Sequence, residues 1–171
     1  MGAKKIYVGK IEPTLVSAES DVNIIGFSID PQSFLKKDIG KYLADAIIEE
    51  GEKTGIFLPL KSSIAADFEI TGEVKEFYYK MSVKEIPMKG EGYAYYYKAD
   101  FNLHVNCIVK QKGGGIMEKN YTSINEHATV YHTLTNWEKP FTEDLNIVIF
   151  EIVEELFSDI EKTFITHIEI K

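Results

Sequence analysis

One stretch of the sequence organises the expected fold: Ala66-Asp67-Phe68-Glu69-Ile70-Thr71-Gly72-Glu73-Val74-Lys75-Glu76-Phe77-Tyr78-Tyr79. Apolar and polar residues alternate from Phe68 to Val74, which predicts a β-strand with one buried face. Gly72 lies inside this alternation, where a glycine indicates either a β-bulge or the close approach of another backbone. A bulge would also explain why the alternation ends in consecutive aromatic residues. We therefore expect a central strand over residues 66–79.

The residues before this strand predict strands and one helix. The strands are expected at Lys5–Ile11, at Val22–Ile29 and at Gly55–Leu60, with Pro13 and a polar connection through residues 19–21 between the first two, and a turn at Ser62–Ala66. Asp30 and Pro31 are typical of a helix start, because Asp accepts free backbone N–H groups and Pro lacks one. Apolar residues at helical spacing then predict an amphipathic helix from Gln32 to Glu50, ended by Gly51.

The residues after the central strand predict a loop, a long hairpin and a second helix. We expect the loop at Met81–Gly92, a strand at Tyr93–Lys110 with its odd-numbered residues buried, a turn at Gln111–Gly115, and a partner strand at Ile116–Tyr131 with Ile124, Ala128 and Val130 on one face. A continuous apolar stripe predicts a helix over Phe141–Phe164, with Thr142 as a candidate cap and a solvated acidic face at Glu151, Glu154, Glu155 and Asp159. Residues 165–171 are expected to form a short strand or a tail.

Each expected helix has one apolar stripe, and each strand has at least one apolar face. The economical arrangement places both helices on one side of a single sheet. We therefore predict an α+β fold, a two-layer sandwich with a mixed, mostly antiparallel sheet. A chain of 171 residues is long enough for one well-buried domain, so we expect a single domain over 1–171 with its core at about 5–164.

Composition excludes some classes of function. The net charge is −8, with 19 basic residues scattered among 27 acidic ones, so we expect no nucleic-acid partner. Cys107 is the single cysteine. We expect it to be buried as a small apolar side chain and not to act as a reactive thiol. The glycines at 113–115 are read as a hairpin turn, because no Lys-Ser or Lys-Thr follows them as in a phosphate-binding loop.

Sequence motifs give no support for catalysis. The histidines, His104, His127, His132 and His167, lack metal-binding spacing, and we expect no catalytic, cofactor-binding or metal-binding residues and no cofactor. An enzyme of unrecognised type remains an alternative, and it would need a cleft where several of four residues converge: Glu73, Glu126, His104 and His127.

Aromatic residues are the feature most open to a functional interpretation. Core packing accounts for the odd-numbered tyrosines of residues 93–97, but not for Tyr96, nor for whichever of Tyr78 and Tyr79 faces outward. Exposed aromatic side chains are common anchors at protein interfaces. Tyr78, Tyr96 and, more weakly, Trp137 are therefore the candidate protein-binding residues.

The pattern Ala66-Asp67-Phe68-x-Ile70-x-Gly72-Glu73-Val74, placed between an amphipathic helix and a long hairpin, resembles a strand of small bacterial envelope lipoproteins. The YajG-like lipoproteins, the auxiliary lipoproteins of ABC-type transport systems and the penicillin-binding-protein activator lipoproteins are similar. The order of elements agrees over about Lys5 to Phe164, whereas the residue motif is one strand long.

This resemblance implies export, a lipidated cysteine and a periplasm-facing domain at the cell envelope, such as the outer membrane, that acts by binding an envelope protein. Residues 1–5 contain no lipobox cysteine, so the lipid anchor would lie outside this chain. The resemblance brings no catalytic residues. A soluble small-ligand-binding domain, with a pocket between helices and sheet, is the first alternative.

Overall fold

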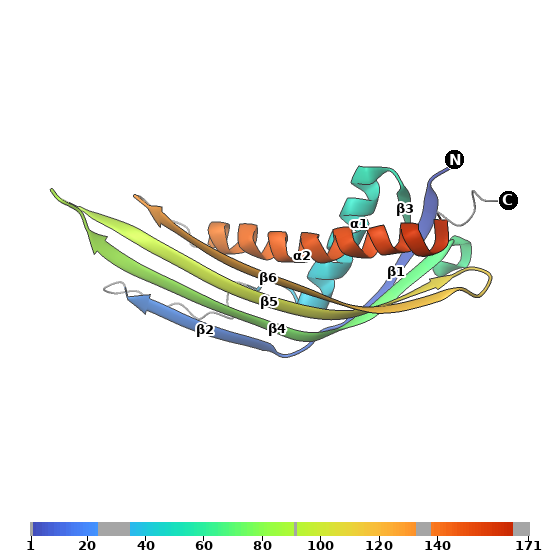
Figure 1. Cartoon of the computed structure of the whole chain (residues 1–171), viewed down its shortest axis with the longest axis horizontal. Helices are drawn as coiled ribbons and strands as arrows, with labels where there is room; N and C mark the ends of the chain where they lie inside the picture. The colour runs from blue at the N-terminus through green and yellow to red at the C-terminus, as the bar shows by residue number, and fades with distance from the viewer. Residues whose placement is uncertain (1, 24–34, 91, 133–137, 166–171) are drawn as a thin grey trace.

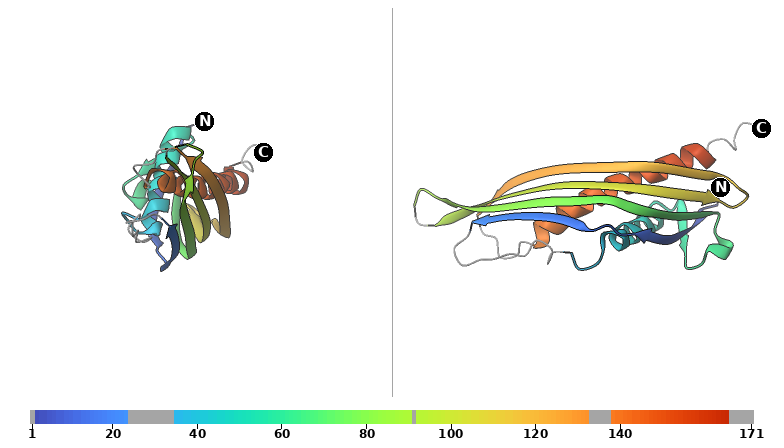
Figure 2. Two further views of the ribbon diagram at one scale, coloured as in Figure 1. Left: turned by 90° about the vertical axis from the view of Figure 1, so that its left-hand side faces the viewer. Right: turned by 90° about the horizontal axis from the view of Figure 1, so that it is seen from below.

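The computed structural model describes residues 2–23, 35–90, 92–132 and 138–165. Within them, six strands form one mixed sheet in the order β3-β1-β4-β5-β6, with β2 also paired to β4. Figures 1 and 2 show both helices on the concave side of this curved sheet. The predicted two-layer α+β sandwich is therefore confirmed.

The elements follow one another as β1 (Lys4–Glu12), β2 (Val16–Asn23), α1 (Ile39–Thr54), β3 (Phe57–Leu60), the 3-10 turn η2 (Ser63–Ala65), β4 (Phe68–Pro87), β5 (Tyr93–Gln111), β6 (Ile116–Tyr131), α2 (Glu138–Ile160) and the π-helical turn η3 (Glu161–Ile165). β4 pairs antiparallel with β5, and β5 with β6. β1 and β2 lie parallel to β4, one after the other along the same edge.

The central strand is longer than its pattern predicted. Residues Met81–Pro87 were expected in a loop, but they continue β4, and Met81 and Val83 are fully buried. Their alternation with polar residues is the same signal as in Phe68–Val74, and Pro87 with the two glycines that follow it obscured this signal. The resulting β4–β5 hairpin reaches well beyond the start of α2 (Figure 1).

Gly72 brings two strands close together. A Cβ atom on Gly72 would lie 2.5 Å from the carbonyl oxygen of Asn106 on β5, which confirms the expected close backbone approach. The strand register shifts nearby, between Val74 and Glu76, where β4 pairs with β5. The structure also shows which of the two adjacent tyrosines faces outward: Tyr79 is buried in the core and Tyr78 faces the opposite side.

The N-terminal third of the chain departs most from expectation. Residues 19–21 were expected to form a polar connection, but they belong to β2. Pairing with β4 provides partners for their backbone N–H and C=O groups and does not require apolar side chains. The expected strand at Val22–Ile29 and the helix start at Asp30-Pro31 lie largely outside the described residues. α1 begins at Ile39, not Gln32, and Asp38 caps it by accepting a hydrogen bond from the Lys41 N–H at 2.8 Å.

Two other boundaries also differ. Gly51 does not end α1 but is buried inside it, and Gly55, with φ of 66°, forms the C-cap. α2 begins at Glu138, three residues before the expected start, so Thr142 lies inside the helix and not at its cap. Ile165 ends the π-helical turn, and the rest of the expected terminal strand or tail, residues 166–171, lies outside the described residues.

The core lies between the helices and the concave face of the sheet. The predicted stripe of α2 is buried there in full, and the odd-numbered residues of β5 are buried from Tyr97 to Val109. Tyr93, by contrast, is 58% exposed near the hairpin tip. On β6 the expected grouping is confirmed: Ile124, Ala128 and Val130 share one face, which is the exposed convex face, and Tyr121 and Ser123 face the helices. Among the described residues, no helix is long and apolar enough to cross a membrane.

Candidate functional site

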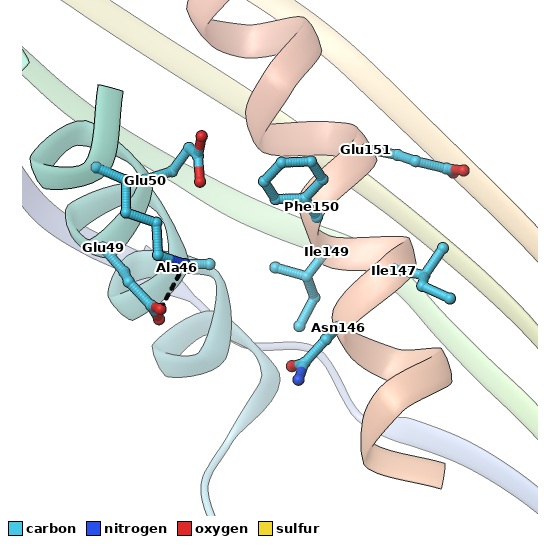
Figure 3. Close-up of a pocket in the computed structure, with 9 residues that line it drawn as sticks. Ala46, Glu49, Glu50, Asn146, Ile147, Ile149, Phe150 and Glu151 are labelled. Atoms are coloured by element: carbon cyan, nitrogen blue, oxygen red, sulfur yellow. Dashed lines mark ion pairs between the residues drawn. The ribbon is translucent and has the colours of Figure 1, made fainter. Parts of the chain in front are cut away.

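A groove open to solvent lies between α1 and α2 (Figure 3). Its volume is about 490 Å³, and its walls include Ala46, Glu50 and Lys53 from α1 and Asn146 and Phe150 from α2. We call this hollow, together with its extension described below, the helix groove. Groove residues from two helices that are distant in the sequence meet because both helices pack on the same face of the sheet.

Each helix exposes a second row of side chains beside its buried stripe. On α2, Ile149 is buried, while its neighbour Phe150 is 41% exposed and points toward α1 (Figure 3). Ile147, 47% exposed, lies on the side of α2 away from α1. On α1, the residues at positions 46, 49, 50 and 53 follow helical spacing and line the opposite wall. The result is a groove open to solvent, with apolar side chains on the α2 wall and mostly charged side chains on the α1 wall.

The groove continues toward the C-terminal ends of both helices. A second hollow of about 210 Å³ shares Glu50 with the first and is lined further by Ile56 before β3, by Glu154 of α2 and by Glu161 of η3. Ile56 is 44% exposed. The two hollows together form an elongated site along α2, from Asn146 to Glu161.

The groove is acidic. Five glutamates line it, at positions 49, 50, 151, 154 and 161, against one cation, Lys53. Lys53 is bound to Glu49 at 2.7 Å within α1, and this carboxylate, through its hydrogen bond, raises the pKa of the lysine above its usual value. The charge that the groove presents to a ligand is therefore negative.

A buried polar cluster fixes the start of α2 to the sheet. The Asp144 carboxylate is 2% exposed and accepts a hydrogen bond from the Tyr97 hydroxyl at 3.0 Å. The His127 Nδ1 atom lies 2.9 Å from the other carboxylate oxygen. Burial, followed by the nearby Asp144 charge, raises the pKa of Tyr97 above its usual value. The tyrosine therefore stays protonated and serves as a donor, which is a structural role.

The same side of α2 makes further polar contacts with β6. Tyr121 and Lys119 bind the Asp159 carboxylate at 3.1 and 2.6 Å, and the Ser123 hydroxyl donates to Glu151. Asp159 and Glu151 therefore do not belong to a merely solvated face, as the sequence suggested. They hold α2 along β6, and this contact orients the helix wall that carries Phe150.

The residues of the enzyme alternative are not brought together. Glu73, His104 and Glu126 lie on the convex face, at separate positions along β4, β5 and β6, and Glu73 is bound to Lys75. His127 lies on the concave face. Within the described residues, no group of three or more potential ligand side chains is placed to hold a metal ion.

The aromatic candidates are placed apart from the helix groove. Tyr78 and Tyr96 are partly exposed on the convex face, where Tyr78 pairs with Asn102 and Tyr96 with Lys84. The two pairs lie six positions apart along β5, roughly 20 Å along the strand. Trp137 lies outside the described residues. A role of Tyr78 and Tyr96 in protein binding stays a prediction.

Sequence reasoning missed the helix groove. The signal that was present is the pair Ile147 and Phe150, which are apolar but lie off the main stripe of α2. No pattern within either helix alone indicates that Glu50 of α1 would face Phe150 of α2, because that depends on how the helices pack.

The strand motif itself is structural. Ala66 is buried, and Asp67 joins three segments: its carboxylate accepts from the Lys5 N–H at 2.8 Å, its own N–H donates to Lys5 at 2.7 Å, and its carbonyl accepts from Lys112 at 2.8 Å. Phe68, Ile70 and Val74 are core residues, and Gly72 allows the close approach of β5. The motif therefore specifies the fold, and it lies away from the helix groove.

Comparison with known proteins supports the fold alone. No family model and no curated protein matches the chain. Protein XCC0632 from Xanthomonas campestris, described under the family DUF330, has a similar structure, with a TM-score of 0.52 and 11% identity over 91% of this chain and 82% of that chain. The likeness shows that the two chains share a fold.

Other structural neighbours are bacterial proteins that are named lipoproteins. The rare lipoprotein B from Shewanella oneidensis has a TM-score of 0.43 and 8% identity over 86% of this chain and 94% of its own. A minor lipoprotein from Acinetobacter baumannii has a TM-score of 0.39 and 12% identity over 93% of each chain. We take no residue role from either protein. Assignment to the YajG-like, transport-auxiliary or penicillin-binding-protein activator families stays a prediction.

Proposed function

We propose that this chain is the periplasm-facing domain of a bacterial envelope lipoprotein and that it acts as a non-catalytic binding or assembly accessory. The observation that carries the binding role is the helix groove, whose larger hollow has a volume of about 490 Å³ and is lined by exposed apolar side chains, such as Phe150, and by glutamates. Its carboxylates lie among apolar side chains and not around a common point where a reacting atom would sit.

The envelope location is supported by the strand motif. The residues that carry the resemblance to envelope lipoproteins, apart from Glu73, each have a structural role in this chain. The names of the bacterial neighbours agree with this location, although it does not rest on them.

Lipid attachment can be tested in a Gram-negative host. The gene, with its natural upstream sequence and a C-terminal tag, is expressed with radiolabelled palmitate, and membranes are separated from the soluble fraction. We expect a labelled protein in the membrane fraction, and loss of both label and membrane association when signal peptidase II is inhibited. An unlabelled protein in the cytosol would contradict the envelope role.

A soluble small-ligand-binding domain is the second candidate. The volume of the larger hollow falls within the range of roughly 300–1,000 Å³ that is typical of small-molecule sites. Native mass spectrometry of the purified protein distinguishes the two candidates, because a co-purifying small molecule would add a constant mass that denaturation removes.

A further inference from the structure

The helix groove has the shape of a binding site for a helix. It runs along α2 from Asn146 to Glu161, which corresponds to roughly 22 Å at the rise of an α-helix. A ligand helix of about 15 residues would match this length. The walls of the larger hollow are α-helices, whose backbone groups are already paired, so this part of the groove offers no strand to which an extended peptide would add. The edge strand β3 contributes only Phe57, at the smaller hollow.

Apolar side chains at intervals along the groove provide anchoring points. Phe150 in the larger hollow and Ile56 in the smaller one are each more than 40% exposed. Exposed aromatic and aliphatic side chains at the centre of such a groove are the usual anchors for the apolar face of an amphipathic helix.

The charge of the groove indicates the sign of the charge that its partner carries. Five glutamates and one lysine line the two hollows. The lysine is paired with Glu49, and Glu151 accepts a hydrogen bond from Ser123 of β6, so the excess of negative charge toward α1 comes from the other three glutamates. Basic residues that flank an apolar face would meet these carboxylates, while an acidic helix would be repelled. An anionic lipid surface would be repelled for the same reason.

We propose that the helix groove binds a basic amphipathic helix of a partner protein. This inference rests on the proposed binding role and names the class of its partner. Apolar residues of the partner helix contact Phe150 and Ile56, and its lysine or arginine side chains pair with Glu50 and Glu154 at the walls.

The proposal can be tested with a peptide of leucine and lysine of about 15 residues, with its leucines at helical spacing. A matched peptide carries glutamate in place of every lysine. Binding of each peptide to the full 171-residue chain is measured by isothermal titration calorimetry, and the contact surface is mapped by NMR chemical-shift changes. We expect the lysine peptide to bind, with shifts at Phe150 and Glu50, and the glutamate peptide to bind at least tenfold more weakly.

Two pairs of variants locate the site. Glu50→Gln with Glu154→Gln removes groove charges, whereas Glu52→Gln with Glu143→Gln removes the same charge from the same helices outside the groove. We expect the first pair to weaken peptide binding about threefold or more, and the second to leave it unchanged. Phe150→Ala should weaken binding about tenfold, whereas Ile124→Ala, an exposed apolar residue of the convex face, should not. Circular dichroism confirms that each variant is folded.

Three results would overturn the proposal: no binding of the lysine peptide, equal binding of both peptides, or equal effects of the groove variants and their controls. The palmitate-labelling test of the envelope role is independent of these three results. A labelled envelope protein that fails the peptide test would therefore keep the proposed envelope role and lose only this choice of partner.

Discussion

Gly72 of β4 and Asn106 of β5 approach so closely that a Cβ atom on Gly72 would lie 2.5 Å from the Asn106 carbonyl oxygen. Gly72→Ala must therefore push apart two long strands at the centre of the sheet. We expect a loss of about 1–3 kcal/mol in the free energy of unfolding, measured by urea denaturation. Gly2→Ala is the control, because no atom lies within 4 Å of the Cβ position there. Equal stability of the two variants would contradict this packing of the strands.

Gly40 and Gly51 predict opposite effects within one helix. Alanine favours a helix over glycine by about 1 kcal/mol at either position. At Gly40, however, the added Cβ would overlap the carbonyl oxygen of Ile11 on β1, whereas at Gly51 it would meet side chains at 3.3 Å or more, which can shift. We expect Gly40→Ala to lower the thermal midpoint and Gly51→Ala to leave it unchanged or raise it.

A gain in stability for Gly40→Ala would mean that α1 does not pack against β1 as closely as described. Because α1 forms one wall of the helix groove, the same pair of variants also tests the position of that wall. Peptide binding should weaken only in the variant that displaces α1.

The sequence predicted the C-terminal half of the fold better than the N-terminal half. In β5 and α2 the apolar period is long and regular, and it reports directly on the buried face. β2 lies at a sheet edge and is held by backbone pairing with β4, so residues 19–21 are polar and resemble a loop. For α1, both Asp30 and Asp38 are suitable caps, and only the observed bond to Lys41 distinguishes them.

The candidate site was harder to predict than the fold. Its carboxylates come from α1 and α2, about 100 residues apart, and their meeting depends on how the two helices pack. Asp144 illustrates the same difficulty: its sequence position predicts a favourable charge near a helix start, whereas its burial against Tyr97 and His127 depends on the sheet.

The Tyr97–Asp144 hydrogen bond should couple the sheet to α2. A double-mutant cycle with Tyr97→Phe and Asp144→Asn, measured by urea denaturation, isolates the interaction from the cost of each change. We expect a coupling energy of about 1.5–3 kcal/mol, because the acceptor is a buried carboxylate. Tyr96→Phe, on the opposite face of the same strand, should show no coupling to Asp144→Asn. A coupling near zero for Tyr97 would mean that the two groups do not interact in solution.

Cys107 predicts a loss of stability in alkaline solution. Its side chain is fully buried, and burial raises the pKa of the thiol to about 12. In the unfolded chain the thiol pKa is about 8.5, so the unfolded state releases the proton first. The stability due to the protonated thiol is therefore complete below about pH 8.5 and is lost as the pH rises toward 12, at about 1.4 kcal/mol per pH unit.

Urea denaturation between pH 8 and pH 10 tests this effect of Cys107. Tyr97 and Tyr121, whose pKa values burial also raises, contribute only above about pH 10. We expect the native protein to lose about 2 kcal/mol over this range, and Cys107→Ala to lose less, whatever its absolute stability. The change with pH is the useful measurement, because removing the thiol also leaves a small cavity beside Gly72. An identical pH dependence in both proteins would mean that the thiol ionises equally in the folded and unfolded chains, and hence that β5 does not bury it.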